Sequence, residues 1–258
     1  MLIAITRQVS PSIGRCELTH LERQMIDVGL ARAQHHQYEA ALAELGCDVH
    51  SLPAEPELPD SIFVEDVAIV LDEVAIVTRP GADSRKPETE SIAQALSVYR
   101  ELCYIQPPGT LDGGDVLRVG KTLYVGRSSR SNPSAIEQMQ TFLAPYGYTV
   151  KGVNVTGCLH LKSAVTQVAA DTLLIHSRWV NRGDFGDMQF IEVDTSEPHA
   201  ANALLIGDTV IYPSSYPRTQ KQLAERGIRL KIVDASEVAK AEGAVTCCSL
   251  VFSDLPGR

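Results

Sequence analysis

Five short stretches of the sequence carry the residue types best suited to covalent chemistry. Among them are cysteine thiols, two histidines and several carboxylates, the groups required for a nucleophile, a general base and a residue that orients the base. These groups are far apart in the chain, so such chemistry requires a fold that brings them together. The stretches are FVED at 63–66, LDGGD at 111–115, LHLKS at 159–163, PHAAN at 198–202 and TCCS at 246–249.

A repeated helix–strand segment is the first sign of such a fold. In four places, apolar residues at spacings of three and four predict a helix, and a short break and an apolar strand follow. For the helix at 133–146, Asn132 is the expected N-cap, Pro133 lies in the first turn and Gly147 follows the end. The helices are predicted at 38–45, 92–102, 133–146 and 220–226, before strands at 46–52, 103–107, 147–155 and 227–235.

Pairs of apolar runs around a polar turn predict four β-hairpins, at 67–77, 115–125, 164–176 and 202–213. The last hairpin is preceded by the strand-like segment 188–194 but by no clear helix. A further strand at 247–252 has no partner after it, and the opening strand at 2–6 is expected to pair with it. The pattern predicts about five strand–strand–helix–strand units around an axis, as one α/β domain over residues 1–258.

The reactive stretches stand at the start of the first hairpin strand of their units. In a ring, these positions converge near one end of the axis. Arginines recur after the second hairpin strands, Arg79 and Arg85 in one unit and Arg127 and Arg130 in the next. We expect these arginines in loops that rim the same opening.

Composition limits the classes of function. The net charge of −9 argues against nucleic-acid binding, which requires a basic face. The N-terminal run MLIAITRQV predicts a strand rather than a signal peptide, and no apolar run approaches the roughly 20 residues that span a bilayer. The six cysteines form no C-x-x-C pair, so we expect reduced thiols, a cytoplasmic location and no structural zinc. Without a phosphate-binding glycine motif, no cofactor is expected.

Five motifs in order resemble those of the dimethylarginine dimethylaminohydrolases, a family of guanidine-modifying enzymes. The resemblance runs from about Pro59 to Phe252 and implies a five-bladed α/β propeller of ββαβ repeats, in agreement with the repeat. It implies that methylated arginines are hydrolysed to citrulline and methylamine or dimethylamine through a covalent thiouronium on a cysteine. The motifs are PDSIFVED, TRPGADSRK, LDGGDVLRVGKTLYVGRSSRSN, LHLKS and GAVTCCSL.

The resemblance implies three catalytic residues. Cys247 is the nucleophile, and a bound guanidinium would favour its thiolate. Cys248 would point to the opposite face of an extended strand. His160 is the general acid and base, with His199 at the corresponding place in the next unit as the alternative. Asp112 orients His160 and stabilises its protonated form, unless it serves only the turn that follows.

Carboxylates of the first unit are the implied guanidinium ligands, because they accept paired hydrogen bonds from its planar N–H groups. Asp66 and Asp60 would hold the substrate nitrogens and Glu65 would support the site. A solvated acidic strand entrance is the alternative, but Glu65 and Asp66 interrupt an apolar strand, where polar groups need partners. Asp115 either faces the guanidinium or caps its turn.

Two arginines, Arg85 and Arg130, are the implied clamp for the substrate α-carboxylate, with Arg127 as a substitute for either. Leu18 matches the family's mobile lid, where a backbone carbonyl contacts the substrate amine. Ala241 is expected to offer a second backbone carbonyl. Phe63 packs against the guanidine or fills the core.

Competing functions remain open at this point. Arginine deiminases use the same nucleophile chemistry on unmethylated arginine, but typically carry an additional helical domain that this sequence lacks. Non-catalytic propellers of the same architecture should lack the Cys, His and carboxylate set. A soft metal such as zinc on Cys247 and His160 is expected to inhibit, and the sequence leaves a monomer or a homodimer open.

Overall fold

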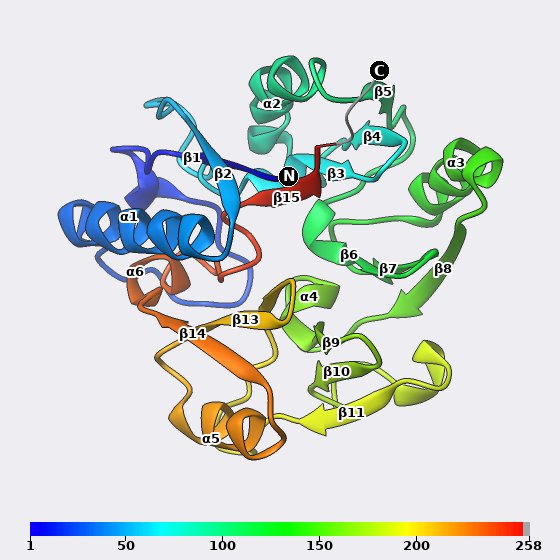
Figure 1. Ribbon diagram of the computed structural model, residues 1–258. Coiled ribbons are helices and arrows are strands. Elements are labelled where there is room, and N and C mark those ends of the chain that lie inside the picture. Colours follow the sequence, from blue (N-terminus) through cyan, green and yellow to red (C-terminus); the bar gives the residue numbers. More distant parts are fainter. Residues whose placement is uncertain (255–258) are drawn as a thin grey trace.

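Three-stranded sheets are the repeating unit of the computed structural model, which describes residues 1–254 (Figure 1). In each of the five sheets, the first strand pairs antiparallel with the second, and the third pairs parallel with the second. The sheets are β15 (Leu250–Ser253) with β1 (Leu2–Arg7) and β2 (Cys47–Leu52); β3 (Ala68–Val70), β4 (Val74–Val77) and β5 (Glu101–Tyr104); β6 (Val116–Val119), β7 (Thr122–Arg127) and β8 (Thr149–Asn154); β9 (Val165–Ala169), β10 (Thr172–Ile175) and β11 (Gln189–Glu192); β12 (Leu204–Ile206), β13 (Thr209–Pro213) and β14 (Arg229–Val233).

A helix joins the second and third strands in four sheets, and these helices lie on the outside of the ring (Figure 1). In the remaining sheet a short 3-10 helix, η6 (Arg182–Phe185), joins β10 and β11. The predicted ββαβ propeller is therefore confirmed, including its unit without a clear helix. The four helices are α1 (Val28–Glu44), α2 (Glu88–Leu96), α3 (Pro133–Leu143) and α5 (Pro217–Glu225).

The two ends of the described chain share one sheet. Strand β1 pairs antiparallel with β15, with Leu2 opposite Ser253 and Ile5 opposite Leu250. Beyond the strands, the backbone N–H of Asp254 donates to the carbonyl of Met1 at 2.7 Å. The predicted closure of the ring by the opening strand is confirmed.

Helix α3 forms as its sequence predicts. The Asn132 side chain accepts a hydrogen bond from the Ala135 N–H at 3.1 Å, and Pro133 occupies the first turn, where a missing N–H costs nothing. After the helix, Gly147 adopts a φ of 75°, the left-handed conformation that glycine reaches without strain. Met139 and Leu143 are fully buried against the neighbouring strands, so the apolar spacing marks the packed face.

The two largest differences from the predicted helix boundaries are the start of α1 and the end of α2. Helix α1 begins at Val28, not at residue 38, because its first half buries the polar residues Gln34 and His35, which hide the apolar pattern. Helix α2 ends at Leu96, not at residue 102. There the buried Arg100 donates to the carbonyls of Leu71 at 2.7 Å and Ser253 at 2.5 Å. These hydrogen bonds stabilise a turn at the place where the predicted helix would have continued.

Short helical turns complete the architecture and include those that carry reactive residues. None of the helices among residues 1–254 is both long and apolar enough to cross a membrane. The short elements are α4 (Leu161–Ala164), α6 (Ser236–Ala239), η1 (Ile13–Arg15), η2 (Val64–Val67), η3 (Asp83–Arg85), η4 (Gly113–Asp115) and η5 (Ala144–Tyr146).

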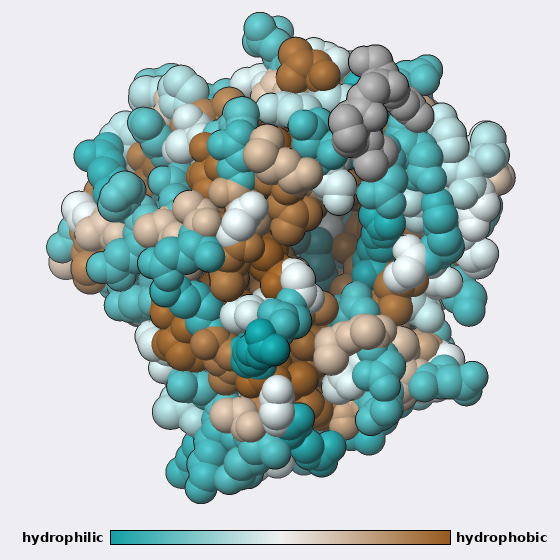
Figure 2. Space-filling view, viewed as in Figure 1, coloured by the Kyte–Doolittle hydropathy of each residue, from teal (hydrophilic) through white to brown (hydrophobic). Residues whose placement is uncertain are grey.

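The first strands of all five sheets line a central cavity of about 550 Å³. Figure 2 shows the molecule hollowed at the centre, with hydrophobic residues at the left of the hollow and below it and hydrophilic residues at its right. Strands β3, β6, β9, β12 and β15 meet there, so the turns that precede them are brought close to one another. The reactive stretches lie in these turns.

Candidate active site

Helical turns, not strand starts, carry the reactive residues. Glu65 and Asp66 lie in η2, Asp115 lies in η4, and His160 is the N-cap of α4. Residues 245–248 also form a turn, and β15 begins only at Leu250, so the predicted strand at 247–252 starts three residues late. A turn lets neighbouring residues point in directions that a flat strand cannot offer.

A small cavity of about 20 Å³ collects most of the predicted site residues. Cys247 and His160 both line it, although they lie 87 positions apart in the sequence. Asp112, Glu65 and Leu18 do not line this cavity themselves. The predicted residues that line it are Asp60, Phe63, Asp66, Arg85, Arg130, His160, Ala241 and Cys247.

His160 and Asp112 form the expected pair. The His160 Nε2 lies 3.0 Å from the Asp112 Oδ2, and the Asp112 carboxylate is fully buried. The other carboxylate oxygen accepts from the Gly81 N–H at 2.8 Å, and the Asp112 N–H donates to the Ser131 hydroxyl at 3.1 Å. Asp112 is therefore held through both its carboxylate and its backbone N–H, and it can fix the orientation of the imidazole.

The protonation of His160 follows from its neighbours. Burial alone would lower the pKa of His160, but the charge of Asp66, the hydrogen bond to Asp112 and the charge of Asp115 outweigh it. Together they raise the pKa of His160 to about 9. At neutral pH the imidazole is cationic and can donate a proton.

Gly114 allows the close approach of His160 to Asp66. The His160 Nδ1 lies 3.8 Å from the Asp66 Oδ1, and the Gly114 N–H donates to the same oxygen at 3.0 Å. A Cβ at residue 114 would lie 2.5 Å from the His160 Nδ1 and 2.7 Å from that carboxylate oxygen. A glycine is required here because any side chain would collide with both groups.

Cys247 is held by backbone contacts on both sides of its side chain. Its N–H donates to the Ala244 carbonyl at 3.2 Å, and its carbonyl accepts from the Glu65 N–H at 3.2 Å. Burial and the nearby negative charges of Glu65 and Asp66 raise the pKa of the Cys247 thiol. The thiol is therefore protonated in the free site, and an added positive charge beside it would favour the thiolate.

Cys248 faces away from this cavity. It is buried in the core and lines a separate small cavity with Tyr38 and Gln34. Its thiol lies 3.5 Å from the Ala244 carbonyl. The opposite orientation of the two cysteines arises in a turn, whereas the sequence suggested an extended strand.

The carboxylates of the first unit serve different sides of the site. Asp60 and Asp66 line the small cavity, and Asp60 also accepts from the Glu17 N–H at 3.0 Å. Glu65 instead lines the central cavity, where it accepts from the Thr246 hydroxyl at 2.8 Å and pairs with Lys162 at 2.5 Å. All three carboxylates are buried, so a solvated acidic entrance does not describe them.

The two predicted arginines differ in how many ion pairs and hydrogen bonds they already form within the protein. The buried Arg85 pairs with Asp66 at 2.6 Å and with Glu88 at 2.8 Å, and also donates to the carbonyls of Asp60 and Phe63 at 3.3 Å. Arg130 donates to the Thr19 hydroxyl at 3.0 Å, and its other terminal nitrogen lies 3.7 Å from Asp112. Arg130 is the more available of the two.

Segment 17–21 lies against the residues that line the cavity. Besides the contacts of Glu17 with Asp60 and of Thr19 with Arg130, the N–H groups of residues 19–21 donate to the Glu242 carboxylate, the His20 bond measuring 2.5 Å. Leu18 is partly buried and packs against the core. Sequence reasoning missed Glu242, whose φ of 59° is unusual for a residue with a side chain, and nothing in its local sequence indicates this role.

Phe63 and Ala241 lie on the cavity wall, and Phe63 is also part of the core. The Arg85 guanidinium carbon lies 6.0 Å from the centre of the Phe63 ring. A Cβ at Gly243 would lie 2.2 Å from the same ring, so the glycine makes room for it. Phe63 therefore serves as both core and wall.

The alternatives raised by the sequence lie elsewhere. Asp115 accepts from the hydroxyls of Ser128 and Ser131 and from the Leu161 N–H, so it ties three loops together and does not line the cavity. His199 lines a different cavity, where its ring packs 5.3 Å from that of Trp179. Arg127 is exposed and does not line the catalytic cavity.

Donor atoms of Asp66, Asp112 and His160 lie within 4.8 Å of one another, the spacing of a metal site. However, Arg85 already neutralises Asp66, and the raised pKa of His160 keeps a proton where a metal would bind. This arrangement favours a histidine cation between carboxylates. Zinc inhibition through Cys247 and His160 remains a prediction.

Comparison with known proteins places this geometry in context. Residues 19–183 match the family model described as N,N dimethylarginine dimethylhydrolase, eukaryotic. An N(G),N(G)-dimethylarginine dimethylaminohydrolase of Streptomyces coelicolor is 38% identical over 255 residues, which cover 98% of this chain and 97% of the relative.

Two solved structures are similar over nearly the whole chain. One is a cysteine-to-serine variant of the Pseudomonas aeruginosa dimethylarginine dimethylaminohydrolase complexed with citrulline, with a TM-score of 0.93 at 35% identity, covering 96% of this chain and 98% of that one. The other is a histidine-to-glycine variant of a dimethylarginine dimethylaminohydrolase as an adduct with S-methyl-L-thiocitrulline, with a TM-score of 0.92 at 35% identity, covering 98% and 100%.

Proposed function

Since this chain belongs to the dimethylarginine dimethylaminohydrolase family and hydrolyses N-omega-methylated arginines, we propose that Cys247, His160 and Asp112 carry out the reaction. One observation supports this above all. The His160–Asp112 pair, with its 3.0 Å contact, presents His160 to the cavity that Cys247 also lines. Nucleophile, general acid and orienting carboxylate thus serve one space.

Substrate binding begins with charge. The methylated guanidinium is held by Asp66 and Asp60, whose carboxylates accept its N–H groups. Glu65 supports them from the other side of η2. Arg130 is the main contact of the substrate α-carboxylate, and Arg85 adds a second positive charge while it holds Asp66 in place. Binding therefore depends on both ends of the amino acid.

The bound guanidinium then favours the thiolate form of Cys247, which attacks it. In the free site Glu65 and Asp66 disfavour a further negative charge and raise the pKa of the Cys247 thiol. A bound cation offsets those charges, so the thiol releases its proton to solvent as the substrate binds. The thiolate then attacks the central guanidine carbon. Because the cation is the substrate, the nucleophile forms only when the substrate is present.

His160 acts in both halves of the reaction. It gives its proton to the methylated nitrogen, the C–N bond breaks and dimethylamine or methylamine leaves, so a thiouronium remains on Cys247. The neutral imidazole then takes a proton from a water molecule that attacks the same carbon. The C–S bond breaks, citrulline forms and the thiolate is released. Asp112 stabilises each imidazolium state.

Segment 17–21 acts as a lid over this chemistry. The cavity of about 20 Å³ is far smaller than the roughly 300 Å³ or more of pockets that enclose small molecules, so the lid must move to admit an arginine. The carbonyls of Leu18 and Ala241 then contact the substrate amine. Closure excludes water during the first half-reaction.

Product analysis tests this proposal. The enzyme is incubated with arginine, monomethylarginine and asymmetric dimethylarginine in ¹⁸O-labelled water, and the products are identified by mass spectrometry. We expect citrulline carrying one heavy oxygen, with dimethylamine or methylamine from the methylated substrates. Ammonia from arginine as the preferred reaction would instead indicate a deiminase. No citrulline from any of the three substrates would overturn the proposal.

The state of the cysteines bears on the location of the enzyme. All six are free, and none is paired in a disulfide. Free thiols persist in reducing compartments. We propose that the enzyme works in the cytoplasm, which fractionation of cells with an antibody to this chain would test.

A further inference from the structure

One of the five reactive stretches, PHAAN, has no role in the mechanism above. The other four supply the carboxylates, Asp112, His160 and Cys247. The histidine of PHAAN, His199, lies in another cavity. Its last residue, Asn202, lies two residues before β12, the inner strand of its unit, and is buried. By position in the repeat, Asn202 is the residue that this unit contributes near the axis.

The Asn202 amide grips the residue that precedes the nucleophile. Its oxygen accepts from the Thr246 N–H at 3.0 Å. Its nitrogen donates to the Thr246 hydroxyl at 3.0 Å and to the Lys162 carbonyl at 3.1 Å. Both amide protons and the amide oxygen are therefore used, and two of the three bonds go to Thr246.

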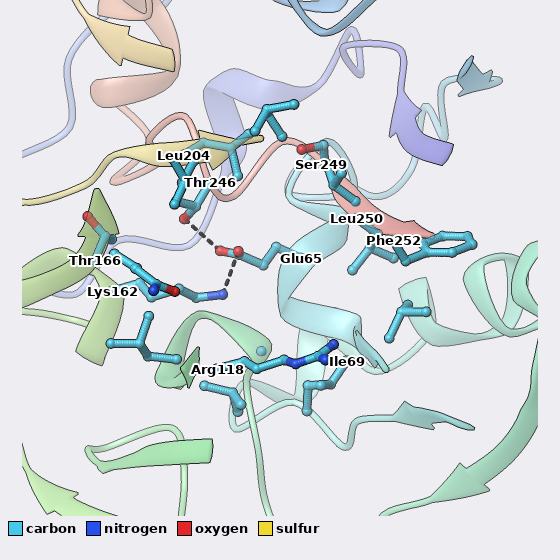
Figure 3. A pocket seen from close by; sticks show the side chains of 18 of the residues that line it. Glu65, Ile69, Arg118, Lys162, Thr166, Leu204, Thr246, Ser249, Leu250 and Phe252 are labelled. Carbon is cyan, nitrogen blue, oxygen red and sulfur yellow. Dashed lines mark hydrogen bonds and ion pairs between the residues drawn. The ribbon is translucent and has the colours of Figure 1, made fainter. Parts of the chain in front are cut away.

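These contacts belong to a closed ring of hydrogen bonds. The Thr246 hydroxyl, which accepts from Asn202, donates its own proton to Glu65 at 2.8 Å. Glu65 pairs with the Lys162 Nζ at 2.5 Å. The Lys162 carbonyl accepts a hydrogen bond from Asn202, and this contact closes the ring. Figure 3 shows the carboxylate of Glu65 between the Thr246 hydroxyl and the Lys162 amine. Four units of the propeller are thereby linked.

The ring fixes the backbone on both sides of Cys247. Asn202 holds the Thr246 N–H, one residue before the nucleophile. Glu65 contributes its own N–H, which donates to the Cys247 carbonyl at 3.2 Å. Because a displacement of about 1 Å at a reacting atom can cost about 10²-fold in rate, such support bears directly on the attack.

We propose that Asn202 is a positioning residue, which places the Cys247 sulfur for attack by gripping both the N–H and the hydroxyl of Thr246. The inference rests on the proposed function, since it takes Cys247 as the nucleophile. Asn202 itself does not line the catalytic cavity. It acts through the turn at 245–248, so its removal should slow the reaction of bound substrate and leave substrate affinity nearly intact.

The test compares Asn202→Ala with Gln140→Ala in the full-length enzyme. Gln140 is a matched control, because its side-chain amide also forms hydrogen bonds with the backbone. It accepts from the Val150 N–H at 2.9 Å and donates to the Tyr148 carbonyl at 3.3 Å. These contacts lie at the outer strand β8. With asymmetric dimethylarginine, at a temperature where thermal melts show both variants folded, we expect kcat to fall by about 10-fold to 100-fold in Asn202→Ala, with KM within about threefold. Gln140→Ala should keep both constants.

Two substitutions at Thr246 keep the test decisive if Asn202→Ala does not fold. Thr246→Ser retains the hydroxyl and should stay within about threefold of the parent kcat, whereas the isosteric Thr246→Val should lose about tenfold or more. An unchanged kcat in Asn202→Ala or in Thr246→Val overturns the inference, as does a rise in KM alone. The parent enzyme run alongside separates the two claims, because a parent without turnover means that the proposed function has failed.

Discussion

Two cavities lie on two sides of the same turns, and their contents differ sharply. The central cavity is large, about 550 Å³, and the catalytic cavity is small, about 20 Å³. Adjacent residues divide between them. Glu65 faces the central cavity and Asp66 the catalytic one, while Thr246 and Cys247 divide in the same way. Each of these turns thus contributes residues to both cavities.

The difference lies in the groups that the buried charges surround. In the central cavity, Lys162 pairs with Glu65, and Arg118 pairs with Asp72 at 2.8 Å. In the catalytic cavity, the thiol of Cys247 has a raised pKa, and the imidazole of His160 carries a proton. That second set is completed by a cationic substrate. Volume alone therefore favours the central cavity, whereas the raised pKa values of a thiol and an imidazole favour the small cavity as the candidate active site.

Among the variants that test this contrast between the two cavities, Cys247→Ser should have the largest effect on kcat. A hydroxyl forms the anionic nucleophile far less readily than a thiol, so we expect kcat to fall by about 10³-fold or more. Steady-state release of citrulline measures the change. Cys248→Ser is the matched control, because the same substitution one residue away lies outside the cavity and should cost far less. Equal losses in the two variants would contradict the assignment.

His160→Gly should lower turnover by about 10³-fold, within the range of general acid–base catalysis. The thiol remains, so an activated guanidine with a good leaving group should still react with Cys247. Mass spectrometry of the intact protein should detect this adduct, because the water step is blocked. Rapid turnover without an adduct would show that another group supplies the proton.

Asp112→Asn should lower kcat by roughly 10²-fold and alter its pH dependence. His160, with a pKa of about 9, is cationic below that pH and loses its proton above it, so the parent activity should decline above about pH 9. The substitution removes an acceptor and a charge that favour the cation, so the decline should begin at lower pH. A pH profile of kcat measures this shift, and an unmoved alkaline limb would argue against the pair.

Arg130→Ala should act on binding. A hydrogen-bonded charge contributes about 1.5 to 3 kcal/mol, so KM should rise by roughly tenfold or more while kcat changes little. The expected contrast is with a methylguanidine that lacks the α-carboxylate, which should react equally well with both forms. A large loss of kcat without a change in KM would place Arg130 in the chemistry instead.

The smallest effect is expected from Arg118→Ala, on the central cavity. The ion pair of Arg118 with Asp72 is partly exposed, and such pairs contribute about 1 kcal/mol or less to stability. Both kcat and KM should stay within about twofold of the parent values in steady-state assays. A loss of tenfold in kcat would show that the central cavity takes part in the reaction.

Much of the fold was readable because the repeat appears in local patterns. The signals around Asn132, Pro133 and Gly147 are local, and α3 follows them closely. Where burial involves polar residues, the pattern fails. The start of α1 was missed because Gln34 and His35 are packed inside, and the end of α2 because Arg100 satisfies distant carbonyls.

The proximity of the predicted site residues could be read from the sequence, but their pairings could not. Most of the predicted residues line one cavity, since the repeat gives each unit an equivalent position. Sequence could not show that Arg85 is already bound by Asp66 and Glu88, because that depends on distances across turns. Lys162 follows the apolar Leu161, and this position was a signal that a half-buried cation needs a partner, which is Glu65.

The shared sheet of β1 and β15 has a consequence during synthesis. The antiparallel partner of β1, at residues 250–253, is translated some 250 residues after β1. Pairings so distant in sequence form slowly, because a long loop must close before any contact is gained. We therefore expect the turn at 245–248, which lies just before β15, to become ordered only after β15 has been translated and has paired with β1.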